Sequence, residues 1–306
     1  MTYDLIIVGG GPAGVSAGVY AARKLLKTIL ITPEFGGQSV VSDDIQNWIG
    51  TPHIKGNDLA KSLEDHLKTY AGDVVGIRQE HVTLISKHDI FFTVTTDVGS
   101  YETKTVLIAT GSHRRKLDIP GAVEFDHRGV TYCASCDGPF FTGQDVVVVG
   151  GGNAAFESAA QLLAYAKSVT ILNRTDVIRA DSLTVQKLSE HKNITIIKNA
   201  VPIRITGEKL ATGIDYEDSV TKEIHHVSTG GIFVEIGALP TTDFAKEVIQ
   251  LTDTGYIVVD PRTGQTSTSG IWAAGDCTDG LYHQNNIAAG DAVKALENIY
   301  VHVKTK

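Results

Sequence analysis

The chain contains little cysteine, and this scarcity limits what its sulfur atoms can do. Among 306 residues there are three cysteines, of which Cys133 and Cys136 form one Cys-x-x-Cys pair and Cys277 is solitary. A structural zinc site needs a second pair of ligands, which the sequence does not supply, so the pair indicates thiol–disulfide chemistry and no metal site. Few cysteines with one pair at redox spacing also suit a reducing compartment, and we expect a cytoplasmic protein.

Long hydrophobic runs and an excess of positive charge are missing as well. The apolar stretches at residues 105–109 and 146–149 have the length of strands, far below the roughly 20 residues that cross a bilayer. Residues 5–8 are too short for the apolar part of a signal peptide. The net charge is −8, which argues against nucleic acid or an anionic membrane as the main partner. We therefore expect neither of these partners.

The composition that is present indicates a large folded chain. A length of 306 residues suits two domains, or one domain inserted in another. Hydrophobic residues make up 42% and charged residues 20%, so a sizeable core can form and disorder is not expected. The 31 glycines fall in loops after apolar runs, a pattern typical of nucleotide-binding turns.

The first such turn lies between a predicted strand at residues 3–8 and an alanine-rich helix. Gly9, Gly11 and Gly14 fit the pattern Gly-x-Gly-x-x-Gly. The first glycine makes the tight turn, the second lets a pyrophosphate approach the backbone, and the third permits close helix packing. Pro12 and Ala13 begin the helix, whose free N–H groups would face the phosphates.

The fingerprint also expects an acid about 20 residues past its last glycine, where a ribose is bound. A second strand is predicted at residues 28–32, and Glu34 is the nearest acid. Pro33 makes the register of this segment ambiguous, so Glu34 is either a ribose ligand or a plain loop residue.

The same pattern returns in the middle of the chain. A predicted strand at residues 145–149 leads into a glycine-rich turn and a helix that continues to about residue 164. Gly150, Gly152 and Ala155 fit Gly-x-Gly-x-x-Ala, with Asn153 and Ala154 between them. Two copies of the motif, each between a strand and a helix, predict two dinucleotide sites.

The residues after the next strand, at residues 168–172, bear on the choice of nicotinamide nucleotide. The strand ends at Asn173-Arg174-Thr175, and Arg179 follows one turn later. An NADH site places an acid here for the ribose 2′-OH, whereas an NADPH site places arginine here for the 2′-phosphate. The residues favour NADPH, while Asp176 among them leaves NADH open.

The cysteine pair lies between the two nucleotide turns. One cysteine can attack a partner's disulfide while the other resolves the mixed intermediate. Asp137 directly follows Cys136, where it can exchange a proton with a leaving thiolate. We interpret the pair as a redox disulfide and Cys277 as a small packing residue.

The rest of the chain supplies the other predicted elements. We expect a core helix at residues 56–71, an antiparallel meander at 205–237, a crossing linker at 237–240, a hairpin at 255–260 and a strand at 270–276. Gly275-Asp276 at the end of that strand can present a carboxylate to a polyol chain. A last helix is predicted at residues 285–300, after His283 and Gln284, and its N-terminus at Asn285 can stabilise negative charge on a ligand ring. Residues 301–306 are expected to fray.

These motifs resemble those of the low-molecular-weight thioredoxin reductases, and are similar to the flavoprotein part of the bacterial alkyl hydroperoxide reductase flavin subunit. The resemblance covers nearly the whole chain. It implies an α/β fold of two Rossmann-like three-layer (ββα) dinucleotide-binding domains, one inserted in the other. The FAD-binding domain would comprise residues 1–112 and 242–306, and the NAD(P)H-binding domain with the Cys-x-x-Cys site residues 113–241. The segments that carry the resemblance are Gly9–Gly14, Gly36-Gly37-Gln38, Ala109-Thr110-Gly111, Cys133–Gly138, Gly150–Ala155 and Gly275-Asp276.

The resemblance implies how these parts act together. Electrons would pass from NADPH or NADH to FAD, then to the Cys133–Cys136 disulfide, and then to oxidised thioredoxin or a similar thiol carrier. Cys136 would face the flavin and, as a thiolate, form the charge-transfer contact with it, Cys133 would attack the carrier, and Asp137 would be the general acid. Family members are usually homodimers, and the inserted domain swivels between two poses.

The resemblance also assigns FAD ligands. The pyrophosphate would lie over Gly11 and Gly14, and the ribityl chain on Asp276. The backbone N–H of Asn285 would lie near the flavin's anionic edge. The isoalloxazine ring would lie near Gln38, Asn47 and Gln284.

The sequence departs from the family pattern at several positions. The usual His-Arg-Arg at the second strand end is Asn173-Arg174-Thr175, and His283 stands where the family has arginine beside the flavin. The thioredoxin-like domains that precede the peroxidase-reducing relatives are not expected, since residues 5–8 begin the FAD domain. Three alternatives therefore stay open: a reductase of a peroxiredoxin or glutaredoxin-like carrier, a ferredoxin-dependent thioredoxin reductase, and a non-catalytic flavin-binding or zinc-binding protein.

Overall fold

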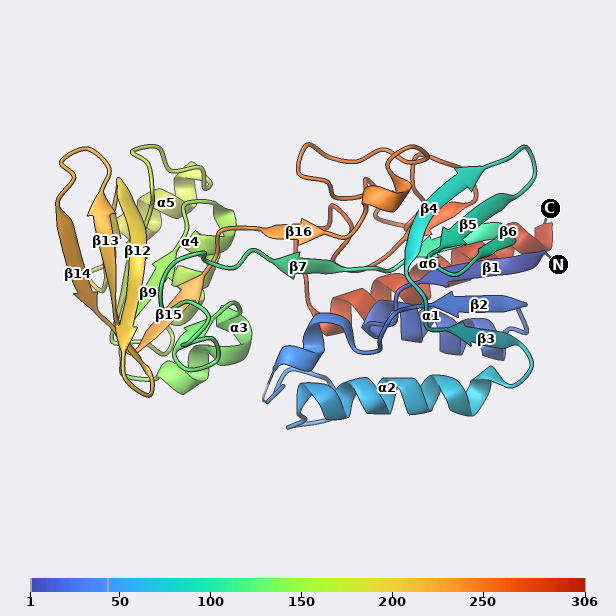
Figure 1. The fold of residues 1–306 in the computed structure, drawn as a ribbon, viewed down its shortest axis with the longest axis horizontal. Helices are drawn as coiled ribbons and strands as arrows, with labels where there is room; N and C mark the ends of the chain where they lie inside the picture. The colour runs from blue at the N-terminus through green and yellow to red at the C-terminus, as the bar shows by residue number, and fades with distance from the viewer. Residues whose placement is uncertain (1, 43, 306) are drawn as a thin grey trace. The chain divides into compact units, whose positions relative to one another are not determined.

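The chain divides into two compact units in the computed structural model, which describes residues 2–42 and 44–305. Unit 1 comprises Met1–His113 and Leu239–Lys306, and unit 2 comprises Arg114–Ala238 (Figure 1). The second unit is thus inserted in the first, and its boundaries lie close to those expected from the sequence at residues 112/113 and 241/242.

Unit 1 is built on a mixed sheet of seven strands in the order β3-β2-β1-β6-β5-β4, with β17 also paired to β6. The strands β1, β2, β3, β17 and the end of β6 pair in parallel. Parallel sheets are covered on both faces, and their strands therefore carry continuous apolar runs. The hairpin β4–β5 joins the edge of β6 in antiparallel pairing. The strands are β1 (Tyr3–Val8), β2 (Thr28–Ile31), β3 (Val75–Arg78), β4 (Val82–Lys87), β5 (Phe92–Thr96), β6 (Ser100–Ile108) and β17 (Ile271–Ala273).

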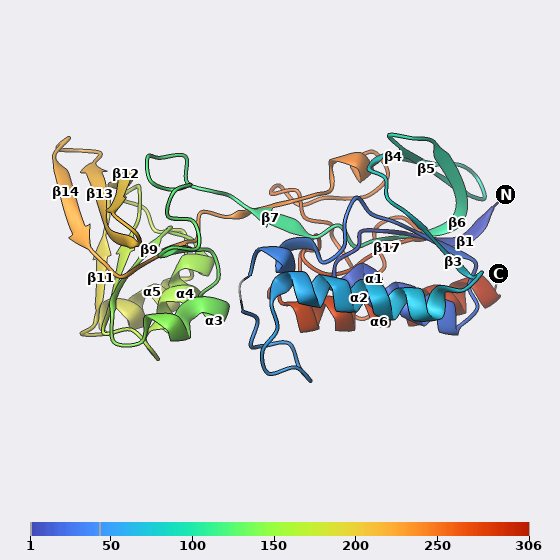
Figure 2. The ribbon, with the colours of Figure 1, turned by 60° about the horizontal axis from the view of Figure 1, so that its bottom comes forward.

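Three long helices cover one face of this sheet (Figure 2). Leu5 and Ile7 of β1 pack against these helices, and the alternate residues Ile6 and Val8 point into a second core on the other face. The helices of unit 1 are α1 (Pro12–Arg23), α2 (Gly56–Ala71) and α6 (Asn285–Thr305), with the short 3-10 helices η1 (Gly37–Val41) and η3 (Asp243–Ala245).

The last helix extends further than the sequence predicted. Residues 301–305 continue α6, and the expected fraying tail is wrong over these residues; Lys306 lies outside the described residues. Val303 packs against the core of unit 1, and the Thr305 hydroxyl donates to the Val301 carbonyl at 2.8 Å. Tertiary contact therefore holds the final turn in helical form.

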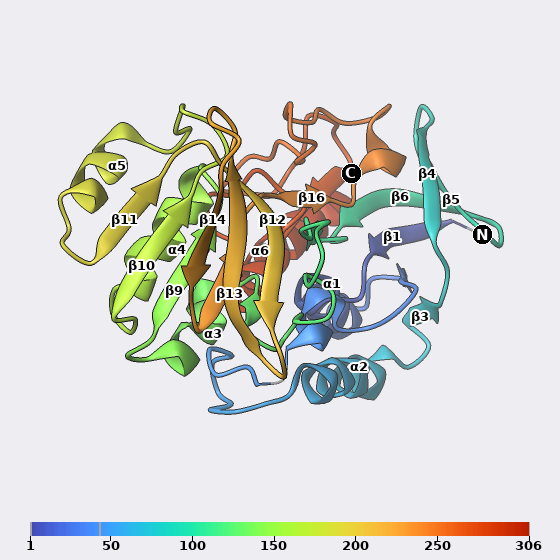
Figure 3. The ribbon, with the colours of Figure 1, turned by 60° about the vertical axis from the view of Figure 1, so that its left-hand side comes forward.

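Unit 2 has three layers around a parallel sheet in the order β11-β10-β9-β15-β8 (Figure 3). Helices α4 and α5 pack on one face of this sheet, and a three-stranded antiparallel sheet, β12-β13-β14, packs on the other. This arrangement confirms the predicted ββα fold class. The elements are β8 (Val130–Thr131), α3 (Ala134–Asp137), η2 (Gly138–Phe141), β9 (Asp145–Val149), α4 (Asn153–Leu162), β10 (Ser168–Leu172), α5 (Ser182–Ser189), β11 (Ile194–Ile197), β12 (Ala200–Gly207), β13 (Ala211–Asp218), β14 (Ile224–Ser228) and β15 (Gly231–Val234).

Two predicted elements differ from the structure. The meander predicted to residue 237 ends with β14, because β15 is buried on both faces and joins the central parallel sheet beside β9. The hairpin predicted at residues 255–260 forms isolated bridges, Leu251 to Ile257 and Val259 to Thr266, in place of paired strands.

The chain passes between the units in two short segments that pair with each other. They are β7 (Ser112–Arg114) and β16 (Ala238–Pro240), which form a two-stranded sheet. Within unit 2, Arg114 forms an ion pair with the buried Glu235 at 3.4 Å and Lys116 one with Asp126 at 2.6 Å. The side chains of Arg114 and Lys116, at the start of unit 2, are therefore held by carboxylates of the same unit.

Among the residues that the structure describes, no helix has both the length and the apolar character needed to cross a membrane.

Candidate functional sites: a dinucleotide cavity, a second nucleotide turn and a redox disulfide

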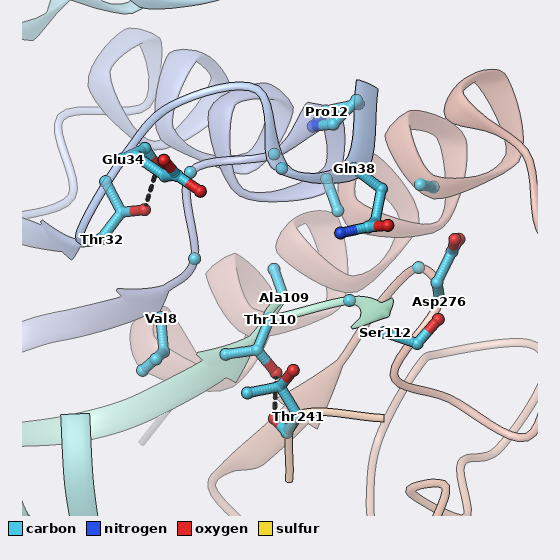
Figure 4. Close-up of a pocket in the computed structure, with 18 of the residues that line it drawn as sticks. Val8, Pro12, Thr32, Glu34, Gln38, Ala109, Thr110, Ser112, Thr241 and Asp276 are labelled. Atoms are coloured by element: carbon cyan, nitrogen blue, oxygen red, sulfur yellow. Dashed lines mark hydrogen bonds between the residues drawn. The ribbon is translucent and has the colours of Figure 1, made fainter. Parts of the chain in front are cut away.

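A cavity of about 320 Å³ opens in unit 1 where β1, β2 and β6 end (Figure 4). The carboxyl ends of parallel strands are where α/β sheets bind their ligands, and the volume suits such a site. Of the residues predicted to bind a cofactor in this unit, those that line the cavity are Gly9, Gly11, Pro12, Ala13, Glu34, Gly37, Gln38, Ala109, Thr110, Gly111, Gly275, Asp276 and Asn285.

The first glycine turn fits a diphosphate. Gly11 is the N-cap of α1 and makes no side-chain cap, so the amides of the first turn stay available. A Cβ on Gly11 would meet only the Gly37 Cα, at 4.0 Å, which leaves its backbone open to the cavity. A Cβ on Gly14 would collide with the Gly9 carbonyl oxygen, so this glycine allows α1 to pack against β1. The residues present therefore fit the pyrophosphate of FAD.

The wall beyond β2 and β3 holds both predicted and unpredicted residues. Glu34 lies on the wall, and its carbonyl accepts the Thr32 hydroxyl at 2.5 Å. Glu80, two residues after the end of β3, is buried and accepts hydrogen bonds from Thr96 and Tyr101, both at 2.7 Å. Sequence reasoning missed this part of the wall, because no local pattern shows that β3 pairs with β2. The lining residues that it missed include Thr32, Ser39, Glu80, His81, Val82, Ser112, His113, Thr241 and Phe244.

The start of α6 lies at the other side of the cavity and is fixed by side-chain hydrogen bonds. The Ser39 hydroxyl donates to the Asn285 side chain at 3.1 Å, and the Asn47 amide donates to Gln284 at 3.1 Å. His283 stacks on Tyr256 with ring centroids 5.7 Å apart. The structure thus places Asn285 on the cavity wall, while Asn47, His283 and Gln284 lie beside it.

The solitary cysteine is buried next to Asp276. Cys277 is a free thiol with no exposed surface, and its sulfur lies 3.4 Å from the Ala274 carbonyl oxygen. Burial raises its pKa to about 11. A thiol with this pKa stays protonated and unreactive at neutral pH, in agreement with a packing role.

The second glycine turn, in unit 2, repeats the geometry of the first with one change. Gly150 adopts a φ of +154°, and a Cβ there would collide with the Glu235 carbonyl oxygen. Gly152 is the N-cap of α4 and faces open space, as Gly11 does in unit 1. Ala155 fills the third position, with Asn153 and Ala154 in the turn before it. The Asn153 side chain accepts the backbone N–H of Asp181 at 2.8 Å and joins this turn to the start of α5.

The side chains after β10 divide into one that points inward and two that are exposed. Asn173 is buried, and its amide nitrogen donates to the carbonyls of Thr175 at 2.8 Å and Val177 at 3.1 Å. The Arg179 backbone N–H donates to the Gly151 carbonyl at 2.8 Å, which places Arg179 beside the glycine turn. Across residues 2–42 and 44–305, the arginine ion pairs are those of Arg114 and Arg204, so Arg174 and Arg179 keep their guanidinium groups available.

The predicted redox pair is confirmed as a disulfide. Cys133 and Cys136 are bonded, with their Cα atoms 5.3 Å apart. Cys133 is the N-cap of α3, and its sulfur accepts the backbone N–H of Cys136 at 3.2 Å. A donor aimed at this sulfur stabilises negative charge on it, which favours Cys133 as the thiolate nucleophile once the pair is reduced.

The surroundings of the disulfide are rich in hydrogen-bonding groups. The Thr131 hydroxyl donates to the Asp137 carboxylate, and the Ser135 hydroxyl donates to Gln161 of α4 at 2.7 Å. Burial, followed by the charge of Asp126, raises the pKa of Tyr132 to about 12. Tyr132 is thus neutral at physiological pH, and Asp137, which directly follows Cys136, supplies a carboxylate to this segment.

Comparison with known proteins places these features in one family. The pyridine nucleotide-disulphide oxidoreductase family matches residues 3–292. The chain superimposes on thioredoxin reductase from Streptococcus pyogenes with a TM-score of 0.90 and 35% identity, covering 100% of this chain and 99% of that one. The chain belongs to the thioredoxin reductases of the pyridine nucleotide-disulphide oxidoreductase family. The family recognition made from the sequence is confirmed.

Longer relatives of this thioredoxin reductase family member carry other names. It is 39% identical over 293 residues to a protein named NADH dehydrogenase from Ferdinandcohnia aciditolerans, covering 96% of this chain and 56% of the relative. It is 39% identical over 304 residues to an alkyl hydroperoxide reductase protein from Pseudomonas putida, covering 98% of this chain and 58% of the relative. The chain therefore spans a little over half the length of these curated relatives.

Proposed function

We propose that the protein is an FAD-dependent disulfide reductase that passes electrons from NADPH to the disulfide of a thioredoxin. The observation that carries this proposal is the Cys133–Cys136 disulfide next to Asp137, in a chain with two dinucleotide turns. A protein that binds dinucleotides and catalyses no redox reaction has no need of such a pair.

The cavity of unit 1 is the proposed FAD site. The backbone N–H groups at the start of α1 bind the pyrophosphate, Asp276 binds the ribityl chain, and Glu34 binds the ribose. Gln38 and Asn285, which line the cavity, contact the ring system, with Asn47, His283 and Gln284 in support. When bound, FAD accepts a hydride from the nicotinamide and makes two electrons available to a disulfide.

The turn of unit 2 is the proposed NADPH site. Gly152 and the start of α4 bind the nicotinamide nucleotide's pyrophosphate, and Arg174 and Arg179 bind the 2′-phosphate by charge-assisted hydrogen bonds. The exposure of both guanidinium groups and the absence of an acid on the strand end favour NADPH over NADH.

The cysteine pair of unit 2 then reduces the carrier. Cys136 would accept electrons from a bound flavin. Cys133 attacks the carrier's disulfide, since the Cys136 N–H group stabilises a thiolate on Cys133. Asp137 supplies a proton to the leaving sulfur. By family resemblance, the protein acts as a homodimer, and its cysteine spacing suits the cytoplasm.

Anaerobic reduction followed by carrier addition tests this function. The purified protein is loaded with FAD, mixed with NADPH or NADH, and followed by the loss of flavin absorbance. Oxidised thioredoxin is then added, and its thiols are counted. We expect faster bleaching with NADPH, and free thiols on thioredoxin in proportion to the donor consumed. A colourless protein that does not bind added FAD would overturn the proposal, and bleaching by neither nucleotide would favour a ferredoxin donor.

A second candidate function is reduction of a peroxiredoxin-type carrier by the same groups. The similarity to the alkyl hydroperoxide reductase protein from Pseudomonas putida favours it. Turnover of oxidised thioredoxin and of an oxidised peroxiredoxin with the same donor separates the two candidates. A higher kcat/KM for the peroxiredoxin would assign the chain to the second function.

A further inference from the structure

The hydroxyl of Thr131 joins two parts of the redox loop. It donates to Oδ2 of Asp137, and its oxygen lies 3.4 Å from the backbone nitrogen of Cys133, which donates to it. One buried hydroxyl, with 5% of the residue exposed, therefore contacts both the acid beside the disulfide and the backbone of the first cysteine.

We propose that Thr131 is a positioning residue that holds the Asp137 carboxylate in place for proton transfer to and from the two sulfurs. This inference rests on the proposed disulfide reductase function, in which Asp137 is the proton donor. It assigns to Thr131 a role that acts through Asp137 and not through the cofactors.

The position of Thr131 in the fold suits this role. Its backbone pairs with Phe233 of β15, the strand beside β9, so it is fixed to the central sheet of unit 2. Asp137 lies six residues later, at the end of the short helix α3, whose four residues are too few to form a stable helix alone. The hydroxyl thus links a short, weak element to the rigid sheet.

The chemistry requires a carboxylate held in one place. Asp137 takes the proton of the Cys133 thiol, and the resulting thiolate attacks one sulfur of the carrier disulfide; a new S–S bond forms, the carrier's S–S bond breaks, and the leaving sulfur takes that proton from Asp137. Asp137 then takes the proton of the Cys136 thiol, and the resulting thiolate attacks Cys133. A Cys133–Cys136 bond forms, the Cys133–carrier bond breaks, and the second leaving sulfur takes this second proton from Asp137. Two electrons and two protons have then moved from the pair to the carrier, with Asp137 unchanged at the end.

A hydrogen bond that orients the acid affects this step and leaves carrier binding unchanged. General acid–base groups contribute about 10²- to 10⁴-fold to rates, and this contribution depends on their geometry. Replacing the hydroxyl by a methyl group in Thr131→Val keeps the volume and the strand position. We expect kcat for thioredoxin reduction to fall about 10- to 100-fold, a part of the full acid contribution, with KM for thioredoxin unchanged.

The experiment compares variants of the FAD-loaded enzyme at one pH. Thr131→Val and Thr131→Ser are measured for thioredoxin turnover, for flavin bleaching by NADPH, and for single-turnover reaction of the reduced pair with a small aromatic disulfide. We expect Thr131→Val to slow both thiol reactions and to leave bleaching unchanged, and Thr131→Ser to restore the rates. Thr229→Val is the matched control, since Thr229 is a buried threonine of unit 2 whose hydroxyl bonds backbone carbonyls.

A double mutant shows whether Thr131 acts through Asp137. If it does, Thr131→Val combined with Asp137→Asn is no slower than Asp137→Asn alone. Additive losses, a rise in KM, or slow turnover in Thr131→Ser would overturn the proposal. So would normal turnover in Thr131→Val. Each of these outcomes leaves the function itself intact, because wild-type turnover of thioredoxin tests the function separately.

Discussion

The two glycine turns of the molecule have nearly the same backbone and different side chains around it. In both units a buried parallel strand runs into a glycine with positive φ and then into a helix whose N-cap glycine faces open space. The third position differs: Gly14 cannot carry a Cβ without meeting Gly9, whereas Ala155 already has one.

The strand ends next to these turns also differ. After β2, the Thr32 hydroxyl donates to the Glu34 carbonyl, and Glu34, with its carboxylate side chain, lies on the cavity wall. After β10, Asn173 turns inward and leaves two arginines exposed. The comparison teaches that two nearly identical backbone turns carry side chains of different charge at the neighbouring strand end. In dinucleotide-binding folds, side chains at this position distinguish one nucleotide from another.

The largest expected effect is the loss of thioredoxin turnover in Cys136→Ser, which tests whether the two units have separate roles. Cys136→Ser removes one sulfur of unit 2 and leaves the cavity of unit 1 untouched. We expect thioredoxin turnover to fall below detection, with FAD content and bleaching by NADPH retained. Absorbance gives the FAD per chain, and a thiol assay gives turnover. Cys277→Ala is the control and keeps turnover; thioredoxin reduction by Cys136→Ser would contradict the assigned role.

A second prediction uses the third position of the turns. Gly14→Ala places a Cβ against the Gly9 carbonyl oxygen, and such overpacking costs about 1–3 kcal/mol. Helix propensity alone would favour alanine by about 1 kcal/mol, so the collision decides the sign. We expect a lower Tm and loss of most bound FAD, measured by thermal unfolding and absorbance. Ala155→Gly in unit 2 should retain FAD; equal FAD in both variants would show that the two turns are equivalent.

A third prediction concerns the strand end of unit 2. Arg174→Ala and Arg179→Ala each remove one of the proposed charge-assisted hydrogen bonds to the 2′-phosphate, worth about 1.4 kcal/mol or tenfold in affinity. We expect KM for NADPH to rise about tenfold in each variant, with KM for NADH unchanged. Steady-state kinetics with both donors checks this. Arg128→Ala, an exposed arginine of unit 2 away from the turn, is the control; equal changes for both donors would exclude a 2′-phosphate contact.

The smallest expected effect concerns the antiparallel strands. In unit 2 they form a separate sheet, β12-β13-β14, whereas in unit 1 the antiparallel strands β4 and β5 belong to the main sheet. Hydrogen bonds from His226 and then from Arg204, directly across the strands, hold the pKa of Asp215 below its ordinary value. A carboxyl group with a lowered folded-state pKa stabilises the fold above its unfolded pKa of about 4 and loses this contribution as the pH falls through the folded value.

Asp215→Asn should therefore lower the free energy of unfolding by about 1 kcal/mol at pH 7, a figure discounted because Arg204 and His226 are half exposed. The gap between wild type and variant should shrink below about pH 4. Urea unfolding followed by circular dichroism at several pH values measures it. Glu217→Gln, which removes the exposed pair with Lys222, should change stability by less than about 0.5 kcal/mol. A gap that persists in acid would contradict the linkage.

The sequence allowed prediction of features that depend on neighbouring residues. The glycine turns and the redox pair are local patterns, and each lies where its spacing predicted it. Glu80 and His81 escaped prediction because their place on the cavity depends on β3 pairing with β2 across a long stretch of chain. Sequence alternation wrongly assigned β15 to the meander, although its run of four buried residues is typical of a parallel central strand.

Side-chain direction was the other limit of sequence reasoning. Asn173 follows the predicted strand as expected, but its contacts were not predictable: its side-chain amide donates to the carbonyls of Thr175 and Val177 in the next loop. Thr131 carried no motif of its own, and only the folded loop brings its hydroxyl to Asp137. Such contacts depend on the path of a short helix or loop, which no periodicity encodes.

The pairing of β7 with β16 means that the excursion of the chain into unit 2 starts and finishes at neighbouring points. A short turn could join these points at small entropic expense, because closing a brief loop restricts few residues. Residues 114–238 therefore form an inserted unit that a short turn could replace. A recombination event at these two points could add or exchange unit 2 without changing the order of the elements in unit 1.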